Sequence, residues 1–171
     1  MRTIFITIGV LVLVGVMVSS TSLAITQATV TATVTVQNFS VALHAPGTVA
    51  YGTLAQNTSY GTVNTPASDT QEAGNNGNSA EDLNIIGTNS TDWNLSFSSG
   101  SQDKYKHTFC TATCSTPPTN YTTLSSQSYQ VLSNDLAAQS SQSFDLRITT
   151  PNPSTVFTQQ SVDVTVQATA P

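Results

Sequence analysis

The sequence predicts an all-β protein: a single β-sandwich, of the immunoglobulin-like or jelly-roll type, behind an N-terminal signal peptide. Three observations lead to this prediction. Short apolar stretches alternate with polar residues and are separated by turn-forming Gly, Pro and Asn residues. Thr and Val, which favour strands, are abundant, whereas Leu, Glu, Lys and Arg, which favour helices, are scarce. No segment has a convincing helical period.

The first 24 residues are expected to be a secretory signal peptide. Arg2 supplies a positive charge, residues 4–18 are apolar, and Ser22-Leu23-Ala24 fits the small-residue cleavage rule. An uncleaved membrane anchor is the alternative, but the apolar run is short for a span, which needs about 20 residues. The predicted organisation is therefore a signal peptide at 1–24 and one β-sandwich domain at 25–171, with no membrane span in the mature chain.

The charge content excludes several functional classes. The chain has 4 Lys and Arg residues against 9 Asp and Glu residues, and only 8% of its residues are charged. So few cations cannot neutralise a phosphate backbone, so we expect no nucleic-acid partner. Acid–base catalysis needs titratable groups with tuned pKa values, and neither His44 nor His107 lies in a recognisable catalytic pattern. We therefore predict no enzymatic activity, no catalytic residues and no cofactor.

Alternation and turn residues place roughly eight to ten strands along the chain. The expected strands are 29–37, 39–43, 49–51, 83–88, 93–97, 105–109, 128–132, 144–149 and 156–168, with a weaker candidate at 58–63. The run Asn75-Asn76-Gly77-Asn78 predicts a tight hairpin, because Asn-Gly accepts positive φ angles. The expected core residues are Ile85, Trp93, Leu95, Phe97, Phe144, Leu146, Ile148, Val164 and Val166.

The segment 29–37 stands out because its alternation is regular and it carries no charge and no proline. At Asn38 the apolar positions shift by one residue, which requires a bulge or a break. Strands usually blunt an exposed edge with charge or proline, and this one does neither. One interpretation is that it pairs inside its own domain. The other is that it is a donor strand for a second copy, with Val30, Ala32, Val34 and Val36 as its apolar face.

Cys110 and Cys114 are the two cysteines of the chain, and they are expected to form a structural disulfide. In a secreted protein two cysteines normally pair, and this spacing closes a small ring around a turn. A redox pair or a metal site is the alternative. The spacing is one residue longer than Cys-x-x-Cys and no second ligand pair follows, so the structural disulfide is favoured.

The sequence also suggests glycosylation sites and an acidic cluster on the surface. Asn-x-Ser/Thr sequons mark five candidate glycosylation sites: Asn38, Asn57, Asn89, Asn94 and Asn120. Chance is the alternative, because Ser and Thr are 51 of the 171 residues. Acidic residues around the Asn-rich turn suggest oxygen ligands for Ca²⁺, but they lack the order of a calcium loop, so no metal site is predicted. These acidic residues are Asp69, Glu72, Glu81 and Asp82.

Several runs resemble a known protein class. They are Ala45-Pro46-Gly47-Thr48-Val49-Ala50-Tyr51-Gly52-Thr53-Leu54, Asn76-Gly77-Asn78 and Leu83-Asn84-Ile85-Ile86-Gly87. The pattern is similar to that of secreted immunoglobulin-like surface proteins of bacteria and archaea. The joining of a signal peptide to one β-sandwich resembles, less closely, the matrix-fibre subunits of the TasA and camelysin group. The resemblance rests mostly on turn residues, implies a sandwich fold, and carries no catalytic residue.

These observations favour a non-enzymatic structural protein, secreted or held at the extracellular surface. It would be a surface-layer or matrix component or a filament subunit, and its partners would be its own copies or other cell-surface proteins. A secreted glycan- or protein-binding module is the alternative. Tyrosines at strand ends would form its aromatic platform, whereas Trp93 is expected in the core. Glycan binding or self-association would distinguish the two hypotheses.

Overall fold

The computed structural model describes residues 27–64, 69–114 and 120–171, and these contain no α-helix. The predicted signal peptide, residues 1–24, lies outside them. The chain divides into two units, Met1–Thr35 and Val36–Pro171, and the second holds every described strand and the described hydrophobic core. No helix among the described residues is long and apolar enough to cross a membrane.

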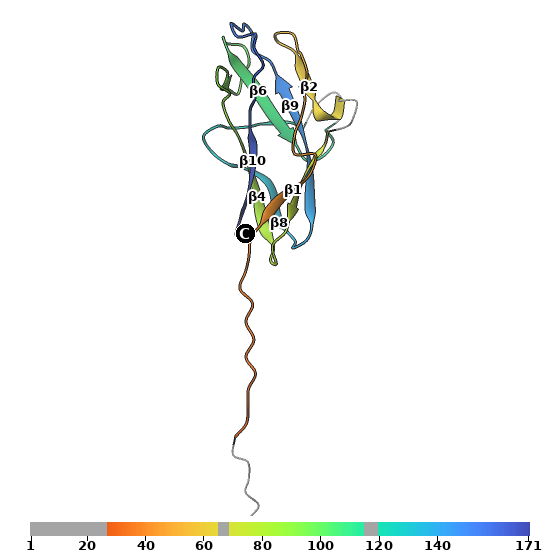
Figure 1. The fold of residues 1–171 in the computed structure, drawn as a ribbon, viewed down its shortest axis with the longest axis vertical. Helices are drawn as coiled ribbons and strands as arrows, with labels where there is room; N and C mark the ends of the chain where they lie inside the picture. The colour runs from red at the N-terminus through yellow and green to blue at the C-terminus, as the bar shows by residue number, and fades with distance from the viewer. Residues whose placement is uncertain (1–26, 65–68, 115–119) are drawn as a thin grey trace, which may run out of the picture. The chain divides into compact units, whose positions relative to one another are not determined.

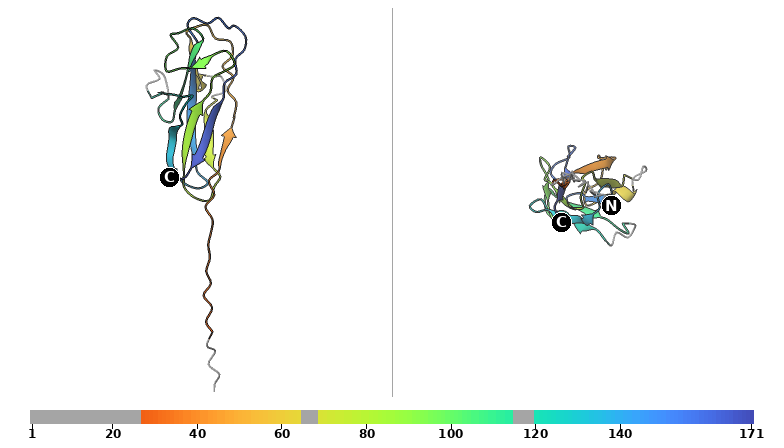
Figure 2. Two further views of the ribbon diagram at one scale, coloured as in Figure 1. Left: turned by 90° about the vertical axis from the view of Figure 1, so that its left-hand side faces the viewer. Right: turned by 90° about the horizontal axis from the view of Figure 1, so that it is seen from below.

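The described strands form two sheets (Figures 1 and 2). The first has the order β1-β3-β9-β6-β5, with β2 pairing with β9 and β7 with β6; the second has the order β10-β4-β8. The first sheet contains β1 (Val41–Ala45), β2 (Ser59–Gly61), β3 (Gln71–Asn75), β5 (Asn94–Leu95), β6 (Lys104–Cys110), β7 (Thr122–Thr123) and β9 (Ser141–Thr149). The second contains β4 (Glu81–Gly87), β8 (Gln130–Leu136) and β10 (Val164–Thr169). A short 3-10 helix, η1 (Thr62–Asn64), follows β2.

One apolar cluster fills the space between the two sheets. In β4 every second residue is buried, as strict alternation requires of a strand with one face against a core. Side chains of β3, β6 and β9 meet those of β4 and β8 there. The cluster comprises Ala73, Leu83, Ile85, Phe109, Leu124, Leu132, Phe144 and Leu146. The predicted β-sandwich is confirmed, and so are Ile85, Phe144, Leu146 and Ile148 as core residues.

The Asn-rich turn is present, but the predicted hairpin is wrong. The turn follows β3 in the first sheet and leads to β4 in the second, so it carries the chain between layers. Asn75 is fully buried, donates through Nδ2 to the carbonyls of Ser79 and Leu136, and accepts from the Gly77 amide. A Cβ at Gly77 would lie 2.2 Å from the Asn38 carbonyl oxygen, so only glycine fits there.

Three expected strands and one core residue are corrected by the structure. Residues 29–37, 49–51 and 156–163 are not in strands, and β10 begins only at Val164. The alternation of residues 29–37 is real, but none of the three segments pairs with a strand among the described residues. Phe97 is 70% exposed, because β5 ends at Leu95 and its alternation no longer fixes which face the next residues occupy.

The backbone just before β1 is held by the side chain of Asn78. Its Oδ1 accepts from the Asn38 amide at 2.8 Å, and its Nδ2 donates to the Val36 carbonyl at 3.0 Å. The Asn78 amide also donates to the Asn38 carbonyl. Together these bonds imitate one rung of a strand ladder. They lie where the sequence phase shifts, and they fix the chain from Val36 onward.

Replacing Asn78 with alanine is expected to lower the free energy of unfolding by about 1 kcal/mol, because two exposed side-chain hydrogen bonds are lost. Urea unfolding measures this change, and faster amide exchange at Asn38 would accompany it. The matched control is Asn76→Ala, which removes a neighbouring exposed side chain whose bond to His44 is 3.3 Å long. Equal losses in both variants would contradict a specific role for Asn78.

Candidate functional site

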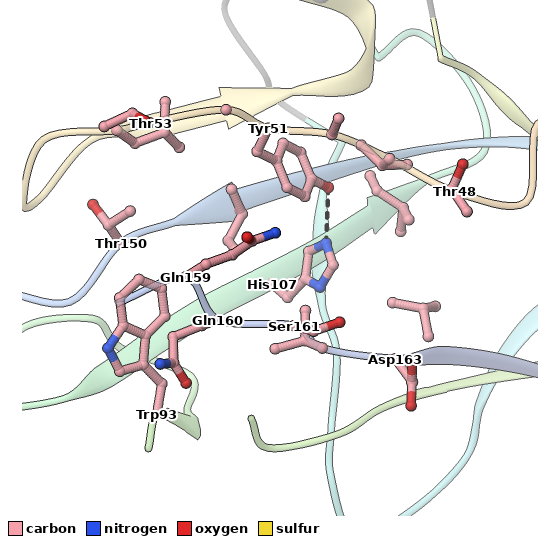
Figure 3. Close-up of a pocket in the computed structure, with 18 of the residues that line it drawn as sticks. Thr48, Tyr51, Thr53, Trp93, His107, Thr150, Gln159, Gln160, Ser161 and Asp163 are labelled. Atoms are coloured by element: carbon pink, nitrogen blue, oxygen red, sulfur yellow. Dashed lines mark hydrogen bonds between the residues drawn. The ribbon is translucent and has the colours of Figure 1, made fainter. Parts of the chain in front are cut away.

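A groove of about 860 Å³ opens in the unit Val36–Pro171, within the size range of pockets that hold ligands. Its floor is the inward face of β6 and β9, with His107, Phe144, Leu146 and Ile148. Two extended segments flank the floor (Figure 3). The first wall is residues 48–54, which follow β1, and the second wall is residues 156–163, which lead into β10.

The two walls form few backbone hydrogen bonds with the rest of the described chain. In the described structure, no backbone–backbone hydrogen bond involves residues 48–54 or 156–162. Gly47 and Gly52 have φ angles of 70° and 71°. These left-handed residues turn the backbone on either side of Thr48–Tyr51, so this stretch does not continue β1. Unpaired extended backbone beside a sheet is the feature to which an added strand binds.

Tyr51 and His107 join the first wall to the floor. The Tyr51 hydroxyl and His107 Nε2 are 2.9 Å apart, and the rings meet edge to face with centroids 5.8 Å apart. Burial lowers the pKa of His107 to about 4 and raises that of Tyr51 above its ordinary value. At neutral pH the imidazole is therefore uncharged and the phenol protonated, so the hydrogen bond between them joins two neutral groups.

The aromatic residues continue from this pair along the groove. Tyr105 lies 6.2 Å from His107 and 6.2 Å from Trp93, measured between ring centroids. The Tyr105 hydroxyl donates to the Thr88 carbonyl. Trp93 lines the groove and is half-buried, where the sequence predicted a core residue. Tyr105 is fully buried beneath the groove lining and Trp93 is half-buried, so these rings do not form an exposed platform.

The four predicted donor-strand residues lie exposed. Val30, Val34 and Val36 are 89%, 91% and 79% exposed, and Ala32 is exposed as well. None of them is in a strand.

The remaining predicted sites have clear positions. Cys110 and Cys114 form the predicted disulfide, with their Cα atoms 5.7 Å apart. All five sequon asparagines are exposed; they are Asn38, Asn57, Asn89, Asn94 and Asn120. Glu81 is buried and accepts from the Ser40 amide, which removes it from the acidic group around the turn. No three His, Cys, Asp or Glu side chains of the described residues gather closely enough to hold a metal ion.

The groove itself was missed by the sequence analysis. Tyr51 and His107 are 56 positions apart, and only the pairing of non-consecutive strands brings their elements together. One signal was available: Gly47 and Gly52 bracket a short apolar run that is too brief for a buried strand. We find no match for this chain among protein-family models, curated proteins or solved structures.

Proposed function

We propose that this chain is a non-enzymatic, secreted structural protein of the cell surface or extracellular matrix, which assembles into filaments by strand addition. In the proposed contact, the Thr/Val segment (residues 29–37) of one copy lies in the groove of the next. The observation that supports this best is that one chain carries both halves of such a contact unpaired. These halves are an exposed alternating segment and a groove whose walls have no backbone–backbone hydrogen bonds at residues 48–54 and 156–162.

The donor half is suited to burial between walls. Its apolar face consists of three valines and one alanine, and its other face is threonine, so it carries no charge that would resist desolvation. Covering the exposed valines with a partner chain is favourable, by about 25 cal/mol for each Å² of apolar surface removed from water. The segment therefore supplies a driving force that the single chain does not use.

The acceptor half offers both kinds of contact that an added strand needs. The walls supply peptide N–H and C=O groups and the partly exposed apolar side chains Val49, Leu54 and Val156. The floor residues Phe144, Leu146 and Ile148 are 3%, 5% and 7% exposed, so they close the bottom of the groove and add little contact area. Backbone hydrogen bonds give affinity in such contacts, and alternate side chains give specificity. When a contact joins two different surfaces, a dimer leaves one segment and one groove free. Further copies can therefore add, and a filament forms unless the chain of copies closes into a ring.

The remaining features agree with a role outside the cell. The predicted signal peptide would direct secretion, and the disulfide between Cys110 and Cys114 is typical of oxidising compartments. Exposed sequons would accept glycans if the host has the transferase. The surface carries few charges and many hydroxyl and amide groups, so copies of the chain can pack against one another with little charge repulsion.

The test compares the predicted mature chain, Ile25–Pro171, with a version that begins at Asn38. The shorter chain keeps every residue of the core cluster, which lies within residues 73–146, and so it is expected to fold. Light scattering and electron microscopy should show filaments for the longer chain and monomers for the shorter one.

Each other outcome has a distinct meaning. If both chains are folded monomers, strand addition is contradicted, and the groove would instead serve a binding module for a glycan or a partner protein. If the shorter chain fails to fold, as judged by circular dichroism, the segment pairs within its own domain. Filaments from both chains would place the assembly contact at another surface.

A further inference from the structure

The groove is not uniform along its length, because one pair of side chains crosses it. Tyr51 descends from the first wall and its hydroxyl meets His107 on the floor at 2.9 Å. Figure 3 shows Thr150, Gln159 and Trp93 on one side of this pair and Thr48 on the other. The Tyr51–His107 pair thus lies between two groups of lining residues of the same groove.

This pair is held firmly in place. His107 is 2% exposed and lies on β6, which pairs with β9 through the partners His107 and Ile148. Its ring contacts Tyr51 edge to face at an interplanar angle of 76° and also lies against Tyr105. Moving either ring would break the hydrogen bond and disturb close-packed neighbours, so an inserted strand must adapt to the pair.

The apolar face of the Thr/Val segment has one small residue between larger ones. Along the face the order is Val30, Ala32, Val34, Val36. Residues two apart on a strand point to the same side and lie about 6.6–6.8 Å from each other. Only Ala32 combines a small side chain with a valine on each side. The order Val-Ala-Val is also the same in both strand directions, so it suits either polarity of insertion.

We propose that the Tyr51–His107 pair sets the register of strand addition by admitting Ala32 beside the Tyr51 ring, with Val30 and Val34 on either side of the pair. This inference rests on the proposed function and specifies the residues that select the partner strand. A shift by two residues would place a valine over the ring pair and overpack it. A shift by one would turn the threonine face inward and expose the valines.

The test uses the mature chain Ile25–Pro171 with four variants: Ala32→Leu, Tyr51→Ala, the combination of both, and Tyr51→Phe. Because every copy carries both segment and groove, a variant at either position is present in every contact of the assembly. Ala32 is exposed in the monomer, so Ala32→Leu cannot disturb folding. The control Thr33→Leu adds bulk to the opposite face of the same segment. The measured quantity is the protein concentration at which light scattering first detects assembly.

Ala32→Leu is expected to raise this concentration about tenfold or more, whereas Thr33→Leu changes it by less than about threefold. Combining Ala32→Leu with Tyr51→Ala should restore assembly, since the removed ring makes room for the larger side chain. Tyr51→Phe keeps the ring and should assemble like the wild type. Circular dichroism of each monomer checks that the variants fold.

The possible failures are distinguishable. If wild-type chains do not assemble, strand addition fails and this inference fails with it. If the wild type assembles but Ala32→Leu assembles as readily as Thr33→Leu, strand addition stands and the proposed register is overturned. If Ala32→Leu is impaired but Tyr51→Ala gives no rescue in a folded chain, Ala32 does not lie over Tyr51.

Discussion

Replacing Val34 with Asp is expected to abolish filament assembly while leaving the stability of the monomer unchanged. Val34 is 91% exposed in the single chain, so a carboxylate there remains solvated and costs nothing. In the proposed contact the same position lies against the apolar floor of the groove. Burying an unpaired carboxylate in such surroundings costs several kcal/mol, and about 3 kcal/mol already weakens each contact more than a hundredfold.

The matched control for this variant is Thr33→Asp. It introduces the same charge one residue away, but on the face that points out of the groove, because strand side chains alternate. It is therefore expected to assemble nearly as well as the wild type in light scattering and electron microscopy at neutral pH. Equal loss of assembly in the two variants would show that charge repulsion between copies is responsible, and that the valine face is not the buried one.

The fold class was predictable because alternation reports burial directly. In β4 the buried positions recur at every second residue, and the sequence Leu83-Asn84-Ile85 shows this without any structure. The same rule failed for residues 29–37, although their alternation is more regular than that of β4. Alternation indicates that a segment has one face to bury, but it does not identify the chain that buries it. That ambiguity left the donor-strand interpretation open.

The groove was not predictable for a different reason. Its floor comes from β6 and β9, its walls from segments after β1 and before β10, and the turn at Asn75 crosses between sheets where a hairpin was expected. Such neighbours follow from strand order, which local patterns do not encode. The sequence around His107 did not indicate a site either, because the hydrogen-bond partner of this side chain is Tyr51, which lies 56 residues away.

Acidification is expected to destabilise the fold through His107, by about 3 kcal/mol between neutral pH and pH 4. Burial lowers the pKa of this imidazole to about 4 in the folded protein, against an ordinary value of 6.5. Between these values the unfolded chain binds a proton that the folded chain does not. The free energy of unfolding therefore rises with pH across this window and levels off above about pH 6.5.

Urea unfolding at several pH values from 4.5 to 7 measures this slope, with His107→Gln as the comparison. The glutamine amide retains a hydrogen-bonding group for the Tyr51 hydroxyl but does not titrate, so its slope should be shallower. Asp103 does not interfere in this range: hydrogen bonds from Thr155 lower its pKa below 3.8, so its contribution is lost only in more acidic solution.

If the wild type and His107→Gln had the same slope, the imidazole would not be buried in its neutral form, and the Tyr51–His107 pair would not be the fixed element that the groove requires.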